Sequence, residues 1–137
     1  MGQHNDRDDE LAAAAQRGVA VGVDLLERRR VMETYARFGE RFLKRVFTER
    51  ELEQAGWRIE RLAGRFAAKE ACAKALGTGI GADAAWREIE ILRLAGGKPR
   101  VVLHGRAAAR AQALGLSAFD VSISDTTEHV MAVVVGL

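Results

Sequence analysis

The sequence predicts an α+β fold in which helices cover one face of a mixed, mostly antiparallel sheet, and three observations support this prediction. Apolar residues recur at roughly helical spacing in the first half of the chain, as at Leu26, Val31 and Tyr35. Runs with alternating or β-branched residues, typical of strands, dominate the second half. Short turns separate these runs, and they favour antiparallel pairing because parallel strands need long crossover connections.

The elements of the first half follow in order. Residues 18–24 form an apolar, β-branched run of strand length, and residues 25–47 continue as one roughly helical stretch. Thr48 and Glu51 form a capping box, which predicts that a short helix begins there. A longer helix is expected over residues 57–76, where a glycine ends it.

The second half is predicted to contain strands and one helix. Phe119, Val121 and Ile123 alternate with polar residues, so they are expected to face the core. The strands are expected at residues 89–91, 100–105, 119–125 and 129–137, with a turn at 96–99 and a helix over 106–115. Residues 1–17 are interpreted as an appended tail, disordered or partly helical, which leaves a domain of residues 18–137.

Composition excludes several classes of protein. Of the 137 residues, 48% are hydrophobic and 29% are charged, which is ordinary for a soluble globular domain. No apolar run approaches the ~20 residues of a membrane helix, and the polar N-terminus is unlike a secretory signal. The single cysteine, Cys72, excludes an internal disulfide and fits a reducing compartment. A cytoplasmic location without membrane association is therefore expected.

The net charge of +2 is unevenly distributed. Residues 28–50 contain eight basic and three acidic residues, a local charge of about +5. Two interpretations stay open, a solvated amphipathic helix and a docking face for an acidic partner. Nucleic acid is the less favoured partner, because the charge is modest and the expected strands lack aromatic stacking positions at their centres.

Glu70 poses a question, because three of the four residues one helical turn away are apolar and only Lys74 offers a hydrogen bond. An unpaired buried carboxylate costs several kcal/mol. The simple answer is an ion pair between Glu70 and Lys74, which have the favourable i, i+4 spacing. Asp24 also has a simple interpretation, since Asp24 and Glu27 have the spacing of a capping box. Alternatively, Asp24 and Glu70 together bind one Mg²⁺, and Lys74 points at phosphates on the same ion.

The glycines of residues 77–81 are a weak signal for phosphate binding. They follow a helix, whereas the common phosphate loops lie between a strand and the start of the next helix. A plain helix terminator is the favoured interpretation, and an anion-binding nest of backbone amides is the alternative.

The chain resembles the holo-acyl-carrier-protein synthases, the small 4′-phosphopantetheinyl transferases, from about Val19 to Val135. The resemblance combines a G-x-D motif near the start with F-x-x-K-E-A-x-x-K-A about forty-five residues later. It is carried by the stretches GVDLLERRRV, FTERELE, RLAGRFAAKEACAKALGTGIG, EIEILRLAGGKPRVVLHG and FDVSISDTTEHVMAVVV. It implies the fold of this family and Mg²⁺-dependent transfer of 4′-phosphopantetheine from coenzyme A to a carrier-protein serine, with release of 3′,5′-ADP, in fatty-acid or polyketide synthesis.

The resemblance assigns roles residue by residue. Asp24 and Glu70 match the two protein ligands of Mg²⁺, and Lys74 matches a lysine that contacts coenzyme A phosphates. Further coenzyme A contacts fall at Arg65, Gly77 and Thr78. Basic residues that meet the acidic acyl carrier protein in relatives correspond to Arg30, Arg37 and Arg41. Members of this type usually form homotrimers whose active sites lie between subunits.

One departure concerns the general base. Many relatives have histidine where this chain has Asp120, so the base stays open between Asp120, Glu70 and a metal-bound water. With Lys74 neutralising phosphate charge, the candidate catalytic set is Glu70, Lys74 and Asp120. An exposed strand residue facing solvent is the simpler interpretation of Asp120. The same departure motivates an alternative function, a non-catalytic module of this fold that binds a carrier protein.

Overall fold

The computed structural model of the chain describes residues 6–8, 10 and 18–137. The elements are β1 (Ala20–Glu27), α2 (Arg28–Phe38), α3 (Glu40–Val46), α4 (Glu49–Ala55), α5 (Ile59–Ala75), η1 (Trp86–Glu88), β2 (Ile89–Arg93), β3 (Pro99–Leu103), α6 (Gly105–Ala113), β4 (Phe119–Asp125) and β5 (His129–Gly136). The α+β prediction is confirmed. The expected tail at 1–17 lies outside the described residues except for 6–8 and 10, so that boundary stays a prediction.

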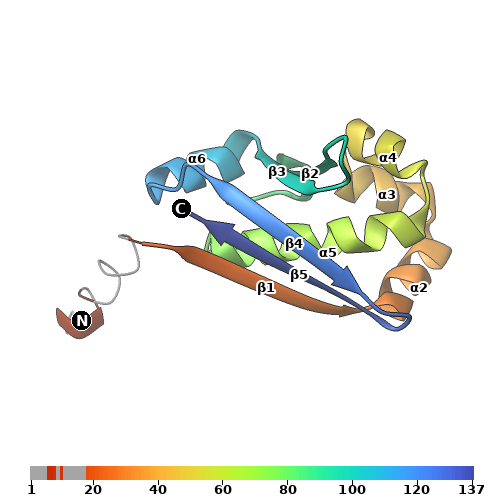
Figure 1. Cartoon of the computed structure of the whole chain (residues 1–137), viewed down its shortest axis with the longest axis horizontal. Helices are drawn as coiled ribbons and strands as arrows, with labels where there is room; N and C mark the ends of the chain where they lie inside the picture. Colours follow the sequence, from red (N-terminus) through yellow and green to blue (C-terminus); the bar gives the residue numbers. More distant parts are fainter. Residues whose placement is uncertain (1–5, 9, 11–17) are drawn as a thin grey trace.

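The strands form two sheets rather than one. The larger has the order β1-β5-β4, the smaller pairs β2 with β3, and every pairing within them is antiparallel. The expectation of one mixed sheet was therefore wrong in detail. Figure 1 shows α5 running along one face of the three-stranded sheet, with the β2–β3 hairpin between α6 and α4. The opposite face of that sheet is not covered by any described element.

The core lies between α5 and the inner face of the larger sheet. Val121 is buried and Ile123 reaches Gly64 on α5, whereas Asp120 and Ser122 are exposed, as the alternation predicted. Cys72 is free and fully buried in this core, and burial raises the pKa of its thiol to about 12. A thiol in that state is a packing group and not a nucleophile.

Two predicted boundaries were wrong. The helical stretch at 25–47 breaks into α2 and α3 at Gly39, whose φ of 60° ends the first helix. The first strand continues to Glu27, because β1 stays paired with β5 as far as His129. Asp24 is therefore a mid-strand residue, and the N-cap of α2 is Glu27, which makes no side-chain cap bond. The capping-box interpretation of Asp24 was therefore wrong, because α2 begins after Glu27.

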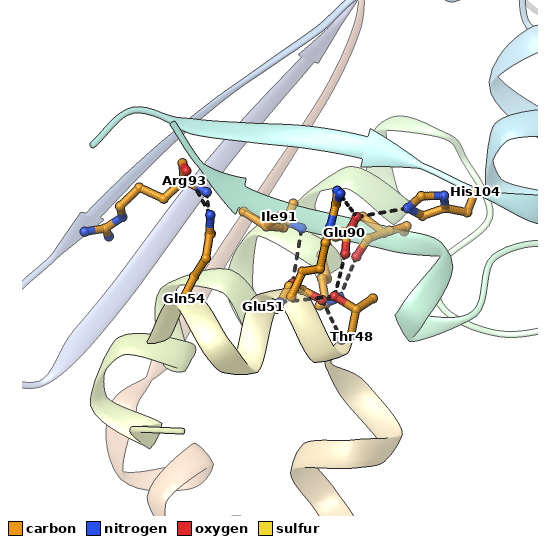
Figure 2. A network of polar contacts seen from close by, with 10 residues as sticks. Thr48, Glu51, Gln54, Glu90, Ile91, Arg93 and His104 are labelled. Atoms are coloured by element: carbon orange, nitrogen blue, oxygen red, sulfur yellow. Dashed lines mark hydrogen bonds and ion pairs between the residues drawn. The ribbon is translucent and has the colours of Figure 1, made fainter. Parts of the chain in front are cut away.

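The capping box at Thr48 is confirmed and extends into a larger polar network. The Thr48 hydroxyl accepts from the Glu51 amide, and the Thr48 amide donates to the Glu51 carboxylate. The second carboxylate oxygen of Glu51 accepts from the amide of Ile91 at 3.1 Å. Figure 2 shows how these bonds and those of Glu90 join the start of α4 to β2. The network fixes the smaller sheet against the helices.

No helix within the described part of the chain is long and apolar enough to cross a bilayer.

Candidate functional site

Close packing of β1 on α5 brings Asp24, Glu70 and Lys74 together. Gly22 lies against the helix backbone, where an added Cβ atom would come within 1.8 Å of the Ala71 carbonyl oxygen. Asp24 follows two residues later on the same face of the strand. The Lys74 ammonium donates to the Val23 carbonyl at 3.0 Å and to the Asp24 carboxylate at 3.3 Å.

Lys74 of α5 therefore forms its ion pair with Asp24 of β1. No bond between Glu70 and Lys74 occurs among the ion pairs and hydrogen bonds of the described residues, so the simple helical pair is not formed. Instead, burial raises the pKa of Glu70, the nearby Asp24 carboxylate raises it further, and Lys74 acts in the opposite direction. Glu70 thus lies beside a second carboxylate, and among the described residues Lys74 is the cation whose charge opposes the rise in its pKa.

This donor set fits a hard divalent cation. Two carboxylates at close quarters repel one another, and a bound cation relieves that repulsion. Mg²⁺ typically takes one or two carboxylates and completes its shell with waters and phosphate oxygens. Within the described residues, no group of three or more His, Cys, Asp or Glu side chains is placed to hold a metal ion. The pair therefore suits an ion shared with a phosphate ligand better than a site made by protein alone.

The glycine turn after α5 uses its amides internally. The amides of Thr78 and Gly79 both donate to the Ala73 carbonyl, and the Gly77 amide donates to Lys74. Gly77 has a φ of 74°, typical of a helix C-terminus. The helix-terminator interpretation is thus supported, because few amides remain to form an anion nest. The Thr78 hydroxyl donates to the Gly79 carbonyl at 2.8 Å.

The structure adds a contact at this turn that the sequence did not indicate. Arg110 of α6 donates to the Leu76 carbonyl at 3.1 Å and lies beside Gly77. Arg110 lies over thirty positions after the turn, and spacing along the chain predicts only local partners, so the sequence did not indicate this contact. Arg65, a predicted coenzyme A contact, is buried and donates to the Glu51 carbonyl at 3.2 Å.

Asp120 lies apart from the other candidate catalytic residues within one chain. Its side chain is on the outer face of the larger sheet, whereas Asp24 is on the face toward α5. Asp120 accepts from Lys98 at 2.7 Å, and this hydrogen bond and the Val121 amide lower the pKa of the Asp120 carboxyl. Lys98, Pro99 and Asp120 border a groove of about 350 Å³ on that face.

The predicted docking residues Arg30, Arg37 and Arg41 are all exposed. Arg41 borders a groove of about 420 Å³ whose other walls include Phe42, Phe66 and Trp86. Phe66 and Trp86 stack with their ring centroids 4.8 Å apart. Sequence reasoning missed this aromatic wall, because its members come from α3, α5 and η1. An apolar groove rimmed with arginine matches an amphipathic, acidic surface.

Comparisons with known sequences find extensive similarity to one family. The sequence profile of the 4′-phosphopantetheinyl transferase superfamily matches residues 20–134. A holo-[acyl-carrier-protein] synthase of Herpetosiphon aurantiacus is 45% identical over 125 residues, covering 87% of this chain and 98% of that protein. The synthase of Koribacter versatilis is 40% identical over 120 residues, covering 85% of this chain and 96% of that protein.

Solved structures show the same relationship. The holo-[acyl-carrier-protein] synthase of Neisseria meningitidis has a TM-score of 0.79 at 35% identity and aligns with 86% of this chain and 97% of its own. The Helicobacter pylori synthase in complex with coenzyme A has a TM-score of 0.78 at 29% identity and aligns with 85% and 99% respectively.

Proposed function

The chain belongs to the 4′-phosphopantetheinyl transferase superfamily, and from this premise we propose that it is a holo-[acyl-carrier-protein] synthase. It transfers 4′-phosphopantetheine from coenzyme A to a serine of an apo acyl carrier protein. Three relatives that carry this name match the chain over 94–98% of their own length. The observation within the fold that carries the proposal is the cluster of Asp24, Glu70 and Lys74 at the contact of β1 with α5.

The reaction exchanges one phosphorus–oxygen bond for another. The serine oxygen bonds to the β-phosphorus of coenzyme A, the bond from that phosphorus to the bridging diphosphate oxygen breaks, and 3′,5′-ADP leaves. Lys74, held at Asp24 with a half-exposed side chain, is placed to offset charge on the phosphates. Such charge stabilisation and the alignment of the two reactants are the main sources of rate in phosphoryl transfer.

Asp24 and Glu70 would hold Mg²⁺. When bound, the ion supplies charge neutralisation at the diphosphate. The raised pKa of Glu70 supports this assignment, because burial and, after it, the nearby Asp24 carboxylate both disfavour the charged form of Glu70, and a bound cation would offset both effects. Arg65, Gly77 and Thr78 remain the proposed further contacts of coenzyme A. To donate to a phosphate, the Thr78 hydroxyl would leave the Gly79 carbonyl and the buried Arg65 would leave the Glu51 carbonyl.

We further propose that the active enzyme is a homotrimer with shared active sites. The outer face of the larger sheet carries Val21, Val23 and Leu25 at 63%, 50% and 68% exposure, and Met131 at 41%. An apolar patch of this kind marks an interface. Asp120 lies on the same outer face, so it can act as general base only at the site of a neighbouring subunit.

Arg30, Arg37 and Arg41 are proposed to orient the acidic carrier protein. The aromatic groove beside Arg41 would take an apolar side chain of the carrier between charged contacts. Reversal of charge at Arg41 (Arg41→Glu) is expected to raise KM for the carrier about tenfold through the loss of one charge-assisted contact. KM for coenzyme A is the internal control, and an equal rise in both constants would contradict a docking role.

The test of function is carrier modification followed by mass spectrometry. The protein is mixed with coenzyme A, Mg²⁺ and an apo carrier, and the carrier is expected to gain one phosphopantetheine. Asp24→Asn and Glu70→Gln should each lower the rate by roughly a hundredfold or more. Glu60→Gln, an exposed change on the first turn of the same helix, is the matched control. Failure of the parent protein to modify any carrier under varied metal and pH would overturn the proposal.

The non-catalytic alternative is not favoured. That alternative was suggested by the replacement of histidine by Asp120, but Asp24, Glu70 and Lys74, the residues proposed to bind the metal and a phosphate, lie close to one another. The relatives at 40–47% identity over most of this chain are named as synthases. A cytoplasmic location is proposed as well, supported by the free thiol of Cys72.

A further inference from the structure

Lys69 directly precedes Glu70, but its side chain makes its contacts with other elements than Glu70 does. Successive helical residues point about 100° apart, so the two side chains diverge. The Lys69 ammonium is fully buried and donates to the Glu51 carboxylate at 2.7 Å. It also donates to the carbonyls of Trp86 at 3.0 Å and Ile89 at 2.5 Å. All three bonds tie α5 to α4, η1 and β2, away from the catalytic cluster.

The three N–H groups of the Lys69 ammonium each have an acceptor. Burial lowers the pKa of Lys69, and the Glu51 carboxylate opposes that shift. Glu51 is itself held by the amides of Thr48 and Ile91. No buried side-chain nitrogen or oxygen in the described part of the chain lacks a partner. A buried pair of this kind adds little net stability compared with apolar packing, so its geometry is the more useful property.

Around the catalytic cluster, α5 has few large side chains to fix its rotation. Its larger packed side chains, Leu62, Arg65 and Phe66, lie a turn or more toward the start of the helix. The buried side chains near the site are mostly small, namely Ala67, Ala68, Ala71, Cys72, Ala73 and Ala75. Interlocking ridges of larger side chains normally set how a helix sits on its neighbours. Here the helix meets β1 at Gly22, where backbone touches backbone. A smooth contact of this kind resists rotation weakly.

We propose that Lys69 is a positioning residue whose three buried bonds fix the rotation of α5 and so hold the Glu70 carboxylate beside Asp24. The inference rests on the proposed metal site and deepens it. Lys69 touches neither substrate nor ion, and its effect reaches the reaction through Glu70. Full burial of the Lys69 side chain excludes a direct contact with a phosphate.

The test measures metal binding directly. Mn²⁺, a paramagnetic stand-in for Mg²⁺, is titrated into the purified proteins and the free ion is followed by electron paramagnetic resonance. Lys69→Met, which keeps an unbranched side chain, is expected to weaken Mn²⁺ binding roughly tenfold, in the range seen when outer-shell support of a ligand is lost. In the activity assay kcat should fall, while KM for the carrier stays near the parent value.

A matched control separates positioning from general destabilisation. Glu90 is a buried carboxylate of the same polar network. Its side-chain hydrogen bonds within the described residues go to Thr48, Arg50 and His104 and none goes to α5, so it acts on Lys69 through its charge alone. Glu90→Gln should lower the Tm and leave the Mn²⁺ Kd within about twofold of the parent. An equal loss of Mn²⁺ affinity in both variants at similar Tm would overturn the positioning role.

Two further variants keep the outcomes distinct. If Lys69→Met does not fold, Glu51→Gln replaces it, because it removes the charge that holds the Lys69 ammonium while the two carbonyl bonds remain. The Mn²⁺ Kd is then expected to rise by less than in Lys69→Met, and an unchanged Kd overturns the proposal that all three bonds are needed. Asp24→Asn reports on the site itself. If Asp24→Asn abolishes Mn²⁺ binding and Lys69→Met does not affect it, the positioning role of Lys69 is wrong and the proposed metal site is supported. If Asp24→Asn binds Mn²⁺ like the parent, the metal site and the inference both fail.

Discussion

At the scale of single residues, Glu70 is a carboxylate that the metal-free fold disfavours. Burial and Asp24 both raise its pKa. Glu70→Gln removes the charge and should stabilise the metal-free protein by about 0.5 kcal/mol at neutral pH, a small figure because the side chain is partly exposed and screened. Mg²⁺ should then raise the Tm of the parent but not of the variant. Thermal unfolding with and without Mg²⁺ measures this, and a lower Tm for the metal-free variant would contradict it.

The same residue predicts a pH dependence of stability. Because the folded pKa of Glu70 lies above its ordinary value, the folded state binds more protons than the unfolded state between those two values. Its contribution is fully present below the ordinary pKa and is lost as pH rises through the raised one. The stability of the parent relative to Glu70→Gln should therefore fall across that window without metal. Urea unfolding at several pH values tests it, with the exposed Glu53→Gln expected to show no such trend.

At the scale of elements, the contact of β1 with α5 determines the site. A Cβ atom at Gly22 would lie 1.8 Å from the Ala71 carbonyl oxygen and 2.7 Å from the Ala75 amide nitrogen. Gly22→Ala should thus cost about 3 kcal/mol, at the upper end for overpacking, and should separate Asp24 from Glu70. Denaturant unfolding and carrier modification are both expected to register the loss. Gly18→Ala, where nothing lies within 4 Å, is the control, and equal effects of the two changes would contradict the argument.

Elements were predictable where the pattern is local. The alternation in β4, the capping box at Thr48 and the long helix through Glu70 all appear as expected, since each depends on neighbouring residues. The end of β1 was misplaced because its pairing with β5 decides it, and that partner lies over a hundred residues away. The capping interpretation of Asp24 failed for the same reason. The long-range partners of Lys74 and Lys69 are likewise set by tertiary packing.

At the scale of the whole molecule, the apolar outer face of the sheet predicts assembly. Leu25→Glu places a charge where 68% of the side chain is exposed in the single chain, so its cost to the isolated fold should be within about 0.5 kcal/mol. In an oligomer the same charge would be buried unpaired, and the variant should therefore become monomeric. Light scattering coupled to gel filtration measures this. Gln112→Glu, an exposed change on α6, should leave the oligomer intact, and an oligomeric Leu25→Glu would contradict the proposed interface.

Shared active sites make a stronger prediction, because Asp120 and Glu70 lie on opposite sides of the sheet within one chain. Asp120→Ala and Glu70→Ala should each be nearly inactive alone. Subunits of the two variants, unfolded and refolded together, should regain about a quarter of the parent turnover, since a random mixture pairs the intact residues at one interface in four. Carrier modification by the mixed protein is the measurement. No recovery in a mixture that has reassembled would place the base within the chain that carries Glu70, and an active Asp120→Ala would remove Asp120 from the mechanism.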